Sequence, residues 1–135
     1  MQISTVQAAG GRISLRVDGD TVFIAGEIDQ LSPRDFLAGF FEIVHSMALG
    51  ECLGEVKVNV TELSFLNSSG IKEFLSWILR RNRIPTDKKY KINFLFDPTV
   101  PWQPITLPRL RDLDVDGIQM TPVSQPRQMP LQAVR

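Results

Sequence analysis

The 135-residue chain has few of the residues on which several classes of protein depend. It has one cysteine, Cys52, which we expect in a loop; a lone cysteine forms no internal disulfide and suits a reducing cytoplasm. Its one histidine, His45, is expected to be a partly exposed helical residue, because one His and one Cys do not make an ordinary zinc site. The sequence has no signal peptide pattern, and no apolar run reaches the ~18 residues that cross a bilayer. We therefore expect a cytoplasmic protein that binds no membrane, metal or cofactor.

An excess of charge of either sign is also missing. Lys plus Arg and Asp plus Glu number 15 each, so the formal net charge at pH 7 is zero. A neutral chain is a poor candidate for nucleic-acid binding, which depends on neutralising phosphates. One basic cluster is expected to be a solvated helix end and loop: Arg80, Arg81, Arg83, Lys88, Lys89 and Lys91.

The common catalytic motifs are absent as well. The chain has no Gly-x-Ser-x-Gly nucleophile turn, no phosphate-binding glycine loop and no Gly-x-Gly-x-x-Gly. A triad of Ser69, His45 and either Asp29 or Asp97 is possible by composition, but no pattern places these side chains together. We do not expect an enzyme.

The clearest pattern lies in residues 56–81. At its start Val56, Val58 and Val60 alternate with polar residues, which is typical of a half-buried strand. Farther along, apolar residues recur at the spacing of one helix face: Ile71, Phe74, Leu75, Ile78 and Leu79. The segment therefore predicts a strand, a tight polar loop at 67–70 and a helix over 69–82.

The polar loop reads Asn67-Ser68-Ser69-Gly70. The first turn of a helix has backbone N–H groups without intrahelical partners, and Ser or Asn oxygens accept from them. A helix N-terminus also carries a partial positive charge and tolerates an anion. Gly70 lets the backbone approach closely and leaves the loop uncovered. A serine here is either a helix cap or a hydroxyl presented for modification, and the motif alone favours the cap.

Two short motifs in this chain resemble the STAS domain, the family of anti-anti-sigma factors. One is Leu-x-Phe-Leu-Asn-Ser-Ser-Gly-Ile at 63–71, between a strand and a helix. The other is Gly-Glu-Ile-Asp at 26–29, which is similar to the family's Gly-Glu-Leu-Asp after its second strand. The family's phosphorylated serine precedes the glycine, so the resemblance implies phosphorylation at Ser69, with Ser68 as the rival. Asn67 stands where the family typically has an acid.

The resemblance implies a regulatory protein-interaction module, an anti-sigma factor antagonist switched by serine phosphorylation. Its implied partners are a serine kinase of the anti-sigma type and a phosphatase. Because Asn67 replaces the usual acid, a second interpretation stays open: a STAS-like scaffold or sensor domain that binds a partner or small ligand without phosphorylation. The sequence leaves the oligomeric state open.

We expect the partner to dock on the face that carries the loop, at Asn67, Ser68, Ser69, Gly70, Lys72, Glu27 and Asp29. Trp77 lies off the apolar stripe of its helix and extends either the buried face or this contact surface. Trp102 lies in a proline-rich segment and is either a plug against the core or an exposed partner anchor. We favour the plug.

Periodicity elsewhere predicts strands that alternate with helices. The expected strands are 12–17 and 21–25, paired as a hairpin across Asp18-Gly19, then 55–61, 90–96 and 114–120. The expected helices are 33–49, capped by Ser32 and stopped by Gly50, then 69–82, and a short helix from Thr106 through 113. Residues 1–10 are either frayed or a first short strand.

This order of elements, β-β-α-β-α-β-α-β, implies crossover connections. We predict an α/β fold, STAS-like, with a mixed four- to five-stranded sheet and helices packed mainly on one face. Residues 1–120 are expected to form a single domain, and 121–135, rich in Pro and Gln, a flexible tail. The expected core includes Phe40, Val44, Val58, Phe74, Leu75, Ile78 and Phe94.

Overall fold

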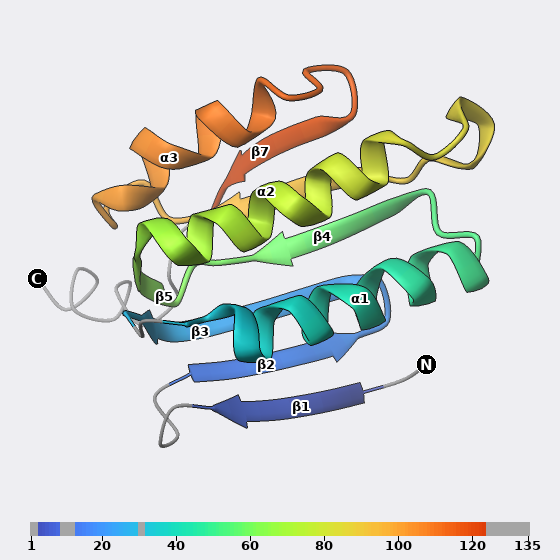
Figure 1. The fold of residues 1–135 in the computed structure, drawn as a ribbon. Coiled ribbons are helices and arrows are strands. Elements are labelled where there is room, and N and C mark those ends of the chain that lie inside the picture. Colours follow the sequence, from blue (N-terminus) through green and yellow to red (C-terminus); the bar gives the residue numbers. More distant parts are fainter. Residues whose placement is uncertain (1–2, 9–12, 30–31, 124–135) are drawn as a thin grey trace, which may run out of the picture.

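The computed structural model describes residues 3–8, 13–29 and 32–123. The strands are β1 (Ile3–Ala8), β2 (Ile13–Asp18), β3 (Thr21–Ile28), β4 (Glu55–Asn59), β5 (Leu63–Leu66), β6 (Lys91–Phe96) and β7 (Ile118–Pro122) (Figure 1). The helices are α1 (Arg34–Gly50), α2 (Ser68–Asn82) and α3 (Trp102–Arg111), with a short 3₁₀ turn, η2 (Thr86–Lys88).

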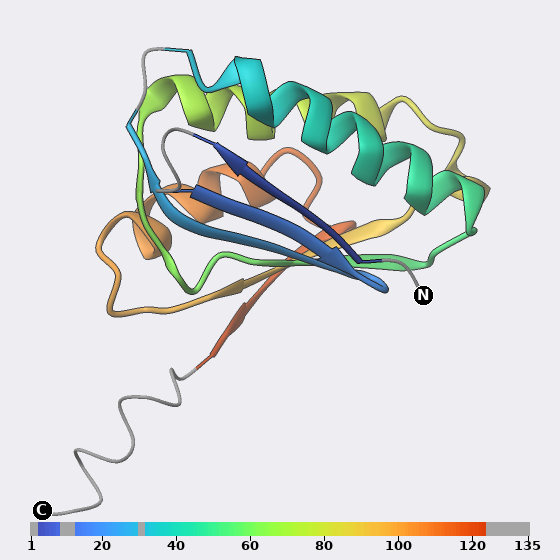
Figure 2. The same cartoon turned by 90° about the horizontal axis from the view of Figure 1, so that it is seen from below.

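The strands form one mixed sheet. Six lie side by side in the order β1-β2-β3-β4-β6-β7, and β5 pairs with the second half of β3, beyond the end of β4. The β1–β2 and β2–β3 pairs are antiparallel, and the others are parallel. Right-handed crossovers in a sheet that grows in one direction place the connecting helices on the same face. Figure 2 shows α1 and α2 along one side of the sheet. The predicted α/β class is confirmed, with more strands than predicted.

The period-2 patterns translate directly into two faces of the sheet. In β2 the residues Ile13, Leu15 and Val17 are buried and their neighbours only partly so. The hairpin between β2 and β3 turns at Gly19, whose φ of 64° is a left-handed conformation that glycine adopts without strain. The predicted hairpin is therefore confirmed, and residues 3–8 adopt the short-strand alternative, pairing with β2.

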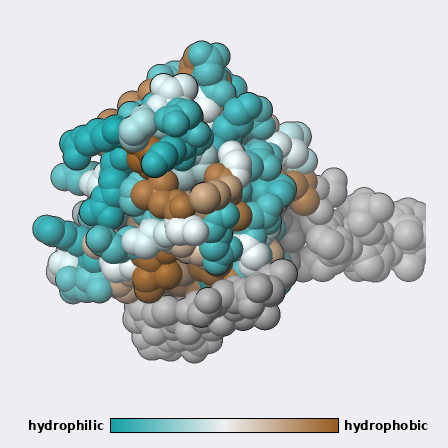
Figure 3. Space-filling view, turned by 90° about the vertical axis from the view of Figure 1, so that its right-hand side faces the viewer, coloured by the Kyte–Doolittle hydropathy of each residue, from teal (hydrophilic) through white to brown (hydrophobic). Residues whose placement is uncertain are grey.

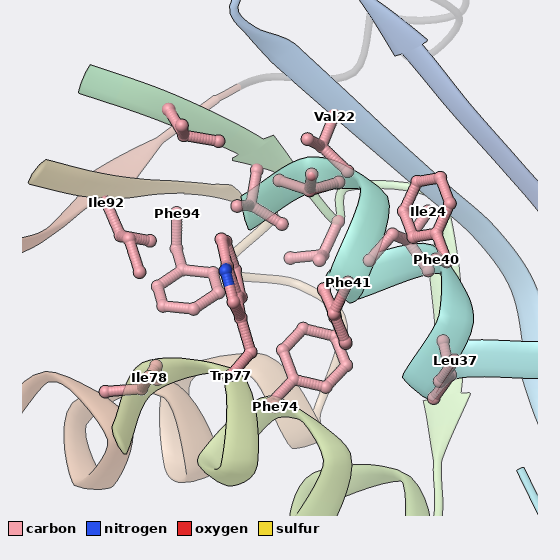
Figure 4. Packing of buried hydrophobic residues seen from close by; sticks show 14 of the residues in the cluster. Val22, Ile24, Leu37, Phe40, Phe41, Phe74, Trp77, Ile78, Ile92 and Phe94 are labelled. Carbon is pink, nitrogen blue, oxygen red and sulfur yellow. The ribbon is translucent and has the colours of Figure 1, made fainter. Parts of the chain in front are cut away.

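The core lies between the sheet and helices α1 and α2. Phe41 of α1 stacks on Trp77 of α2 with ring centroids 4.8 Å apart, and it meets Phe74 edge-on at 5.0 Å (Figure 4). Phe94 of β6 approaches Phe74 from the sheet side, at 6.3 Å between centroids. These aromatic contacts join both helices to the sheet, and six of the seven expected core residues are buried.

The buried face of α2 is turned relative to the predicted stripe. Gly70, Phe74, Trp77, Ile78 and Arg81 are buried, whereas Leu79 is 46% exposed and Leu75 only partly buried. The turn arises because the Trp77 ring stacks on α1 and the Arg81 guanidinium finds polar partners inside. Leu75 was therefore wrongly placed in the core, and Trp77 extends the buried face.

Both ends of α1 differ from the prediction. The N-cap residue is Pro33, and no side chain makes a cap hydrogen bond there, so Ser32 is not the cap. Gly50 remains helical, and the left-handed residue beyond the helix is Cys52, with φ of 53°. The Cys52 N–H donates to the Leu49 carbonyl and the Leu53 N–H to the Ala48 carbonyl, the paired bonds that close a helix in this way.

Two strand boundaries were also wrong. Residues Gly26-Glu27-Ile28 continue β3 rather than leaving it. The strand predicted over 55–61 ends at Asn59, because the Asn59 Oδ1 accepts from the Thr61 N–H (3.0 Å) and hydroxyl (2.6 Å) and turns the chain. The chain then forms β5, which the sequence reading missed.

The C-terminal third holds the remaining corrections. Helix α3 begins at Trp102, not Thr106, and Pro108 lies inside it. Val115 is 63% exposed in a turn, and the last strand is shifted to Ile118–Pro122. The first two residues assigned to the tail therefore pair with β6, and 124–135 lie outside the described residues.

Candidate functional site

The candidate site begins where β5 passes into α2. Asn67 is the N-cap residue, with extended backbone (φ −79°, ψ 172°), and its Oδ1 accepts from the Gly70 N–H at 2.8 Å. Asn and Ser are about equally good N-cap residues, so the residue types alone do not predict which of them caps α2. Because Asn67 supplies the cap, Ser68 and Ser69 occupy the first two helical positions with their hydroxyls not used as caps.

The two serines differ in their surroundings. Ser68 is exposed, whereas Ser69 is partly buried and lines a surface hollow of about 340 Å³. The other walls come from the start of α1 and the first turns of α2: Ser32, Pro33, Arg34, Asp35, Lys72 and Glu73. Ser69 therefore lies where the N-termini of two helices meet, among two basic and two acidic side chains.

Gly70 fixes the position of this helix end. It is buried, and a Cβ on it would lie 2.5 Å from Leu66 Cδ1 and 3.1 Å from Ile28 Cγ2. The Asn67 N–H also donates to the Ile28 carbonyl at 2.9 Å. The prediction that Gly70 permits close approach is confirmed, but Gly70 is packed inside the helix and does not leave the loop uncovered.

The two sequence motifs lie side by side at one end of the sheet. Strand β3 bulges between Gly26, with φ of 107°, and Glu27, and continues in parallel with β5. Glu27 pairs with Phe65, and Ile28 pairs with Leu66 immediately before Asn67. Glu27 and Asp29 are both exposed. Figure 1 shows the tip of β3, β5 and the starts of α1 and α2 at the same end of the molecule.

Phe65 is a surface residue of this site that the sequence reading missed. Phe65 is 48% exposed, while Leu63 and Leu66, the first and last residues of β5, are buried. A strand of four residues gives too short a pattern to show which side chain points outward. The signal was present only as an aromatic residue two positions before Asn67, and exposed aromatic residues are favoured at protein interfaces.

The other end of α2 is closed by a buried polar network. The Trp77 Nε1–H donates to the Tyr90 Oη at 2.9 Å, and the same oxygen lies 2.7 Å from His45 Nδ1. Burial raises the pKa of the Tyr90 phenol to about 12, against an ordinary 10.0. Partial burial, with the nearby Arg80, lowers the pKa of His45. Trp77 is 3% exposed, so it does not belong to the contact surface.

Arg81 completes this network and was wrongly assigned to a solvated cluster. Its Nε donates to the Tyr90 carbonyl at 2.7 Å, and its Nη1 to Asp114 Oδ2 at 2.6 Å. The guanidinium is the main cause of the lowered pKa of Asp114. Gly117 leaves room for this ion pair, because a Cβ there would collide with the Arg81 guanidinium in its present position.

The structure does not bring together the catalytic triad that the composition allows. His45 contacts Tyr90, which bonds Trp77, and Trp77 lies eight positions beyond Ser69, or about 12 Å along a helix. Asp97 is engaged elsewhere, accepting through Oδ1 from the Thr99 N–H (2.9 Å) and hydroxyl (2.7 Å).

Trp102 and Gln103 attach α3 to the segment that leads into β5. The Trp102 Nε1–H donates to the Leu63 carbonyl at 2.7 Å, and the side chain is partly buried against the core. Gln103 is fully buried; its amide donates to the Val60 and Leu63 carbonyls, and its Oε1 accepts from the Asp97 N–H. The plug interpretation of Trp102 agrees with this packing.

Comparisons of the sequence with models of protein families and with curated proteins find no match. Among the described residues, no helix is both long enough and apolar enough to cross a lipid bilayer.

Proposed function

We propose that the chain is a regulatory protein-interaction module that resembles the anti-sigma factor antagonists of the STAS family and is switched by phosphorylation of Ser69. The observation that carries the proposal is the division of roles at the start of α2. Asn67 caps the helix, Gly70 packs against β3 and β5, and Ser69 remains at a partly accessible position between two helix N-termini. The mixed α/β sheet with helices on one face is compatible with that family's fold.

A phosphate at Ser69 is compatible with the folded chain. It adds roughly −1.5 to −2 charges at neutral pH. The N–H groups of the first turn and the partial positive charge of the helix favour an anion at this position. Arg34 and Lys72 line the same hollow, while Asp35 and Glu73 oppose the added charge. We therefore expect modification to leave the fold intact and to change the surface.

The effect on a partner follows from desolvation. A serine kinase of the anti-sigma type, docked over residues 67–70 with Lys72, Glu27, Asp29 and Phe65, would cover Ser69. The two basic and two acidic side chains of the hollow balance one another, so the charge of a phosphate on that serine would be uncompensated when taken out of water, which is costly. Phosphorylation should release the partner without unfolding the module, and a phosphatase would restore binding.

A pull-down from lysate of the native cells tests this function. Wild type and Ser69→Ala are expected to retain a kinase-type partner, and Ser69→Glu is expected to lose most of it. Ser76→Glu is the matched control, because Ser76 is exposed on the same helix two turns away and should retain binding. Equal retention by Ser69→Glu and wild type would overturn the switch, and a partner retained equally by all four proteins would indicate a scaffold without phosphorylation.

A further inference from the structure

A large surface hollow lies at the other end of the molecule from Ser69. It measures about 650 Å³, within the range of roughly 300–1,000 Å³ typical of small-molecule sites. Its apolar wall is formed by Ala48, Leu49, Leu53, Ile84 and Pro85, from the end of α1 and the segment after α2. Figure 3 views this end and shows hydrophobic atoms gathered in the middle of the face, with hydrophilic atoms around them.

Backbone hydrogen bonds hold these walls in place. The Leu53 N–H donates to the Ala48 carbonyl at the end of α1, and the Lys91 N–H donates to the Gly54 carbonyl, each at 2.9 Å. On the opposite wall the Lys88 N–H donates to the Pro85 carbonyl, also at 2.9 Å. The hollow is therefore formed by the folded backbone and needs little ordering when a ligand enters.

The polar rim has an excess of positive charge. Lys88 and Lys89 line the hollow, with Asp87 as the one acidic side chain among its lining residues. Lys89 also acts on Asp114, whose pKa it helps to lower, so part of its charge is already balanced. Lys88 is exposed at the rim and is the cation best placed to meet a ligand.

We propose that this hollow binds a small anion with an apolar body, such as a carboxylate on an alkyl chain or aromatic ring. The apolar wall would take the body of the ligand and Lys88 its charge. Inorganic phosphate has no apolar part, and a cationic amphiphile would meet repulsion from the lysines, so neither fits the hollow. The site is at the far end of α2 from Ser69 and does not depend on the proposed phosphorylation.

Alkylation of Cys52 can report whether a ligand occupies the hollow. Cys52 is the only cysteine in the sequence, is exposed, and lines the hollow. Octanoate is the probe, and the rate at which iodoacetamide alkylates Cys52 is followed by mass spectrometry. We expect octanoate to slow alkylation in a saturable way, while inorganic phosphate and octyltrimethylammonium leave the rate unchanged.

Two variants locate the effect. Lys88→Gln should weaken octanoate binding about threefold to fivefold, the size expected for one partly exposed charge pair. Gly54→Leu should weaken it further, because Gly54 lines the hollow and a Cβ on it meets no atom within 4 Å, so the side chain narrows the hollow without a backbone clash. Arg111→Gln removes one exposed positive charge on α3 and should behave as wild type.

Three results of these experiments would overturn the proposed site. Alkylation that is unaffected by octanoate overturns the site, as does equal protection by octyltrimethylammonium. Protection that survives both Lys88→Gln and Gly54→Leu would place the ligand elsewhere. Circular dichroism melting of each variant checks that a change in alkylation rate is not caused by unfolding.

Discussion

The two ends of helix α2 differ in how they are held and in how far they are buried. The first turn has a side-chain cap from Asn67, two serines not used as caps and a surface hollow shared with α1. The last turns bury an arginine and a tryptophan in hydrogen bonds to Tyr90 and Asp114. About 18 Å of helix separates Ser69 from Arg81, twelve residues apart.

This difference indicates that α2 has two parts with different roles. Its C-terminal half, the anchor, fixes the helix in the fold, and its N-terminal turn, the display end, leaves Ser69 partly accessible. The C-terminal half is fixed to α1, β6 and the turn before β7 by contacts that come from distant parts of the chain. The N-terminal turn is held by the Asn67 cap, by the bond from the Asn67 N–H to the Ile28 carbonyl and by the packing of Gly70. A charge added at the display end is therefore expected to alter recognition, and a change at the anchor end is expected to alter stability.

The largest effect is expected from the middle of α2. Phe74 is fully buried and packs edge-on against Phe41, so Phe74→Ala should lower the free energy of unfolding by roughly 3–5 kcal/mol. Leu79→Ala is the control, because Leu79 is 46% exposed and its loss should cost less than about 1 kcal/mol. Urea unfolding measures both. Equal losses would mean that the helix buries the face the sequence pattern predicted.

Adjacent arginines sharpen the comparison at the C-terminal end. Arg81→Met removes the donor to the buried Tyr90 carbonyl and the partner of Asp114, and it should cost about 2–3 kcal/mol. Arg80→Met breaks an ion pair with Glu42 whose two side chains are 47% and 63% exposed, and it should cost less than about 1 kcal/mol. If the two variants melt together, the buried network does not anchor the helix.

The pH dependence of the anchor follows from Tyr90, the only tyrosine in the chain. A pKa raised from 10.0 to about 12 means that the folded state favours the neutral phenol. This contribution to stability is fully present below pH 10 and is lost as the pH rises toward 12. Tyrosinate absorbance should titrate near 12 in the folded protein and near 10 in denaturant. A folded midpoint near 10 would show that the phenol is open to water.

Two glycines provide the smallest effects, of opposite sign. Gly70→Ala places a Cβ against Leu66 and Ile28 and should destabilise the fold by about 1–2 kcal/mol, after the better helix propensity of Ala is included. Gly39→Ala, in the middle of α1 with no atom within 4 Å of the new Cβ, should stabilise it by up to about 1 kcal/mol. Thermal melting that shows stabilisation by both would contradict the packing of the display end.

The sequence predicted what depends on local periodicity and missed what depends on distant partners. The strands of the hairpin were predictable because one face is buried and the side-chain period is two. Arg81 was not, because its burial depends on a carbonyl nine residues away and a carboxylate thirty-three residues away. The four residues of β5 were too few to show a period, so Phe65 was missed.

The candidate site follows the same division. Residues 67–70 stood out as a strand-to-helix junction, and Glu27 and Asp29 were expected on the same face. Which residue caps the helix could not be predicted, because Asn and Ser cap about equally well. Asn67, the residue that caps the helix, also donates its N–H to the Ile28 carbonyl, so its position depends on a contact with β3.

The central claim is that Ser69 is the regulated residue, and phosphosite mapping tests it most directly. The protein is isolated from its native cells with phosphatases inhibited, and its peptides are sequenced by tandem mass spectrometry. Our account predicts phosphate on Ser69, in a fraction that falls when the sample is treated with phosphatase. Phosphate confined to Ser68 or to another residue, or none under any growth condition in which the partner is expressed, would contradict it.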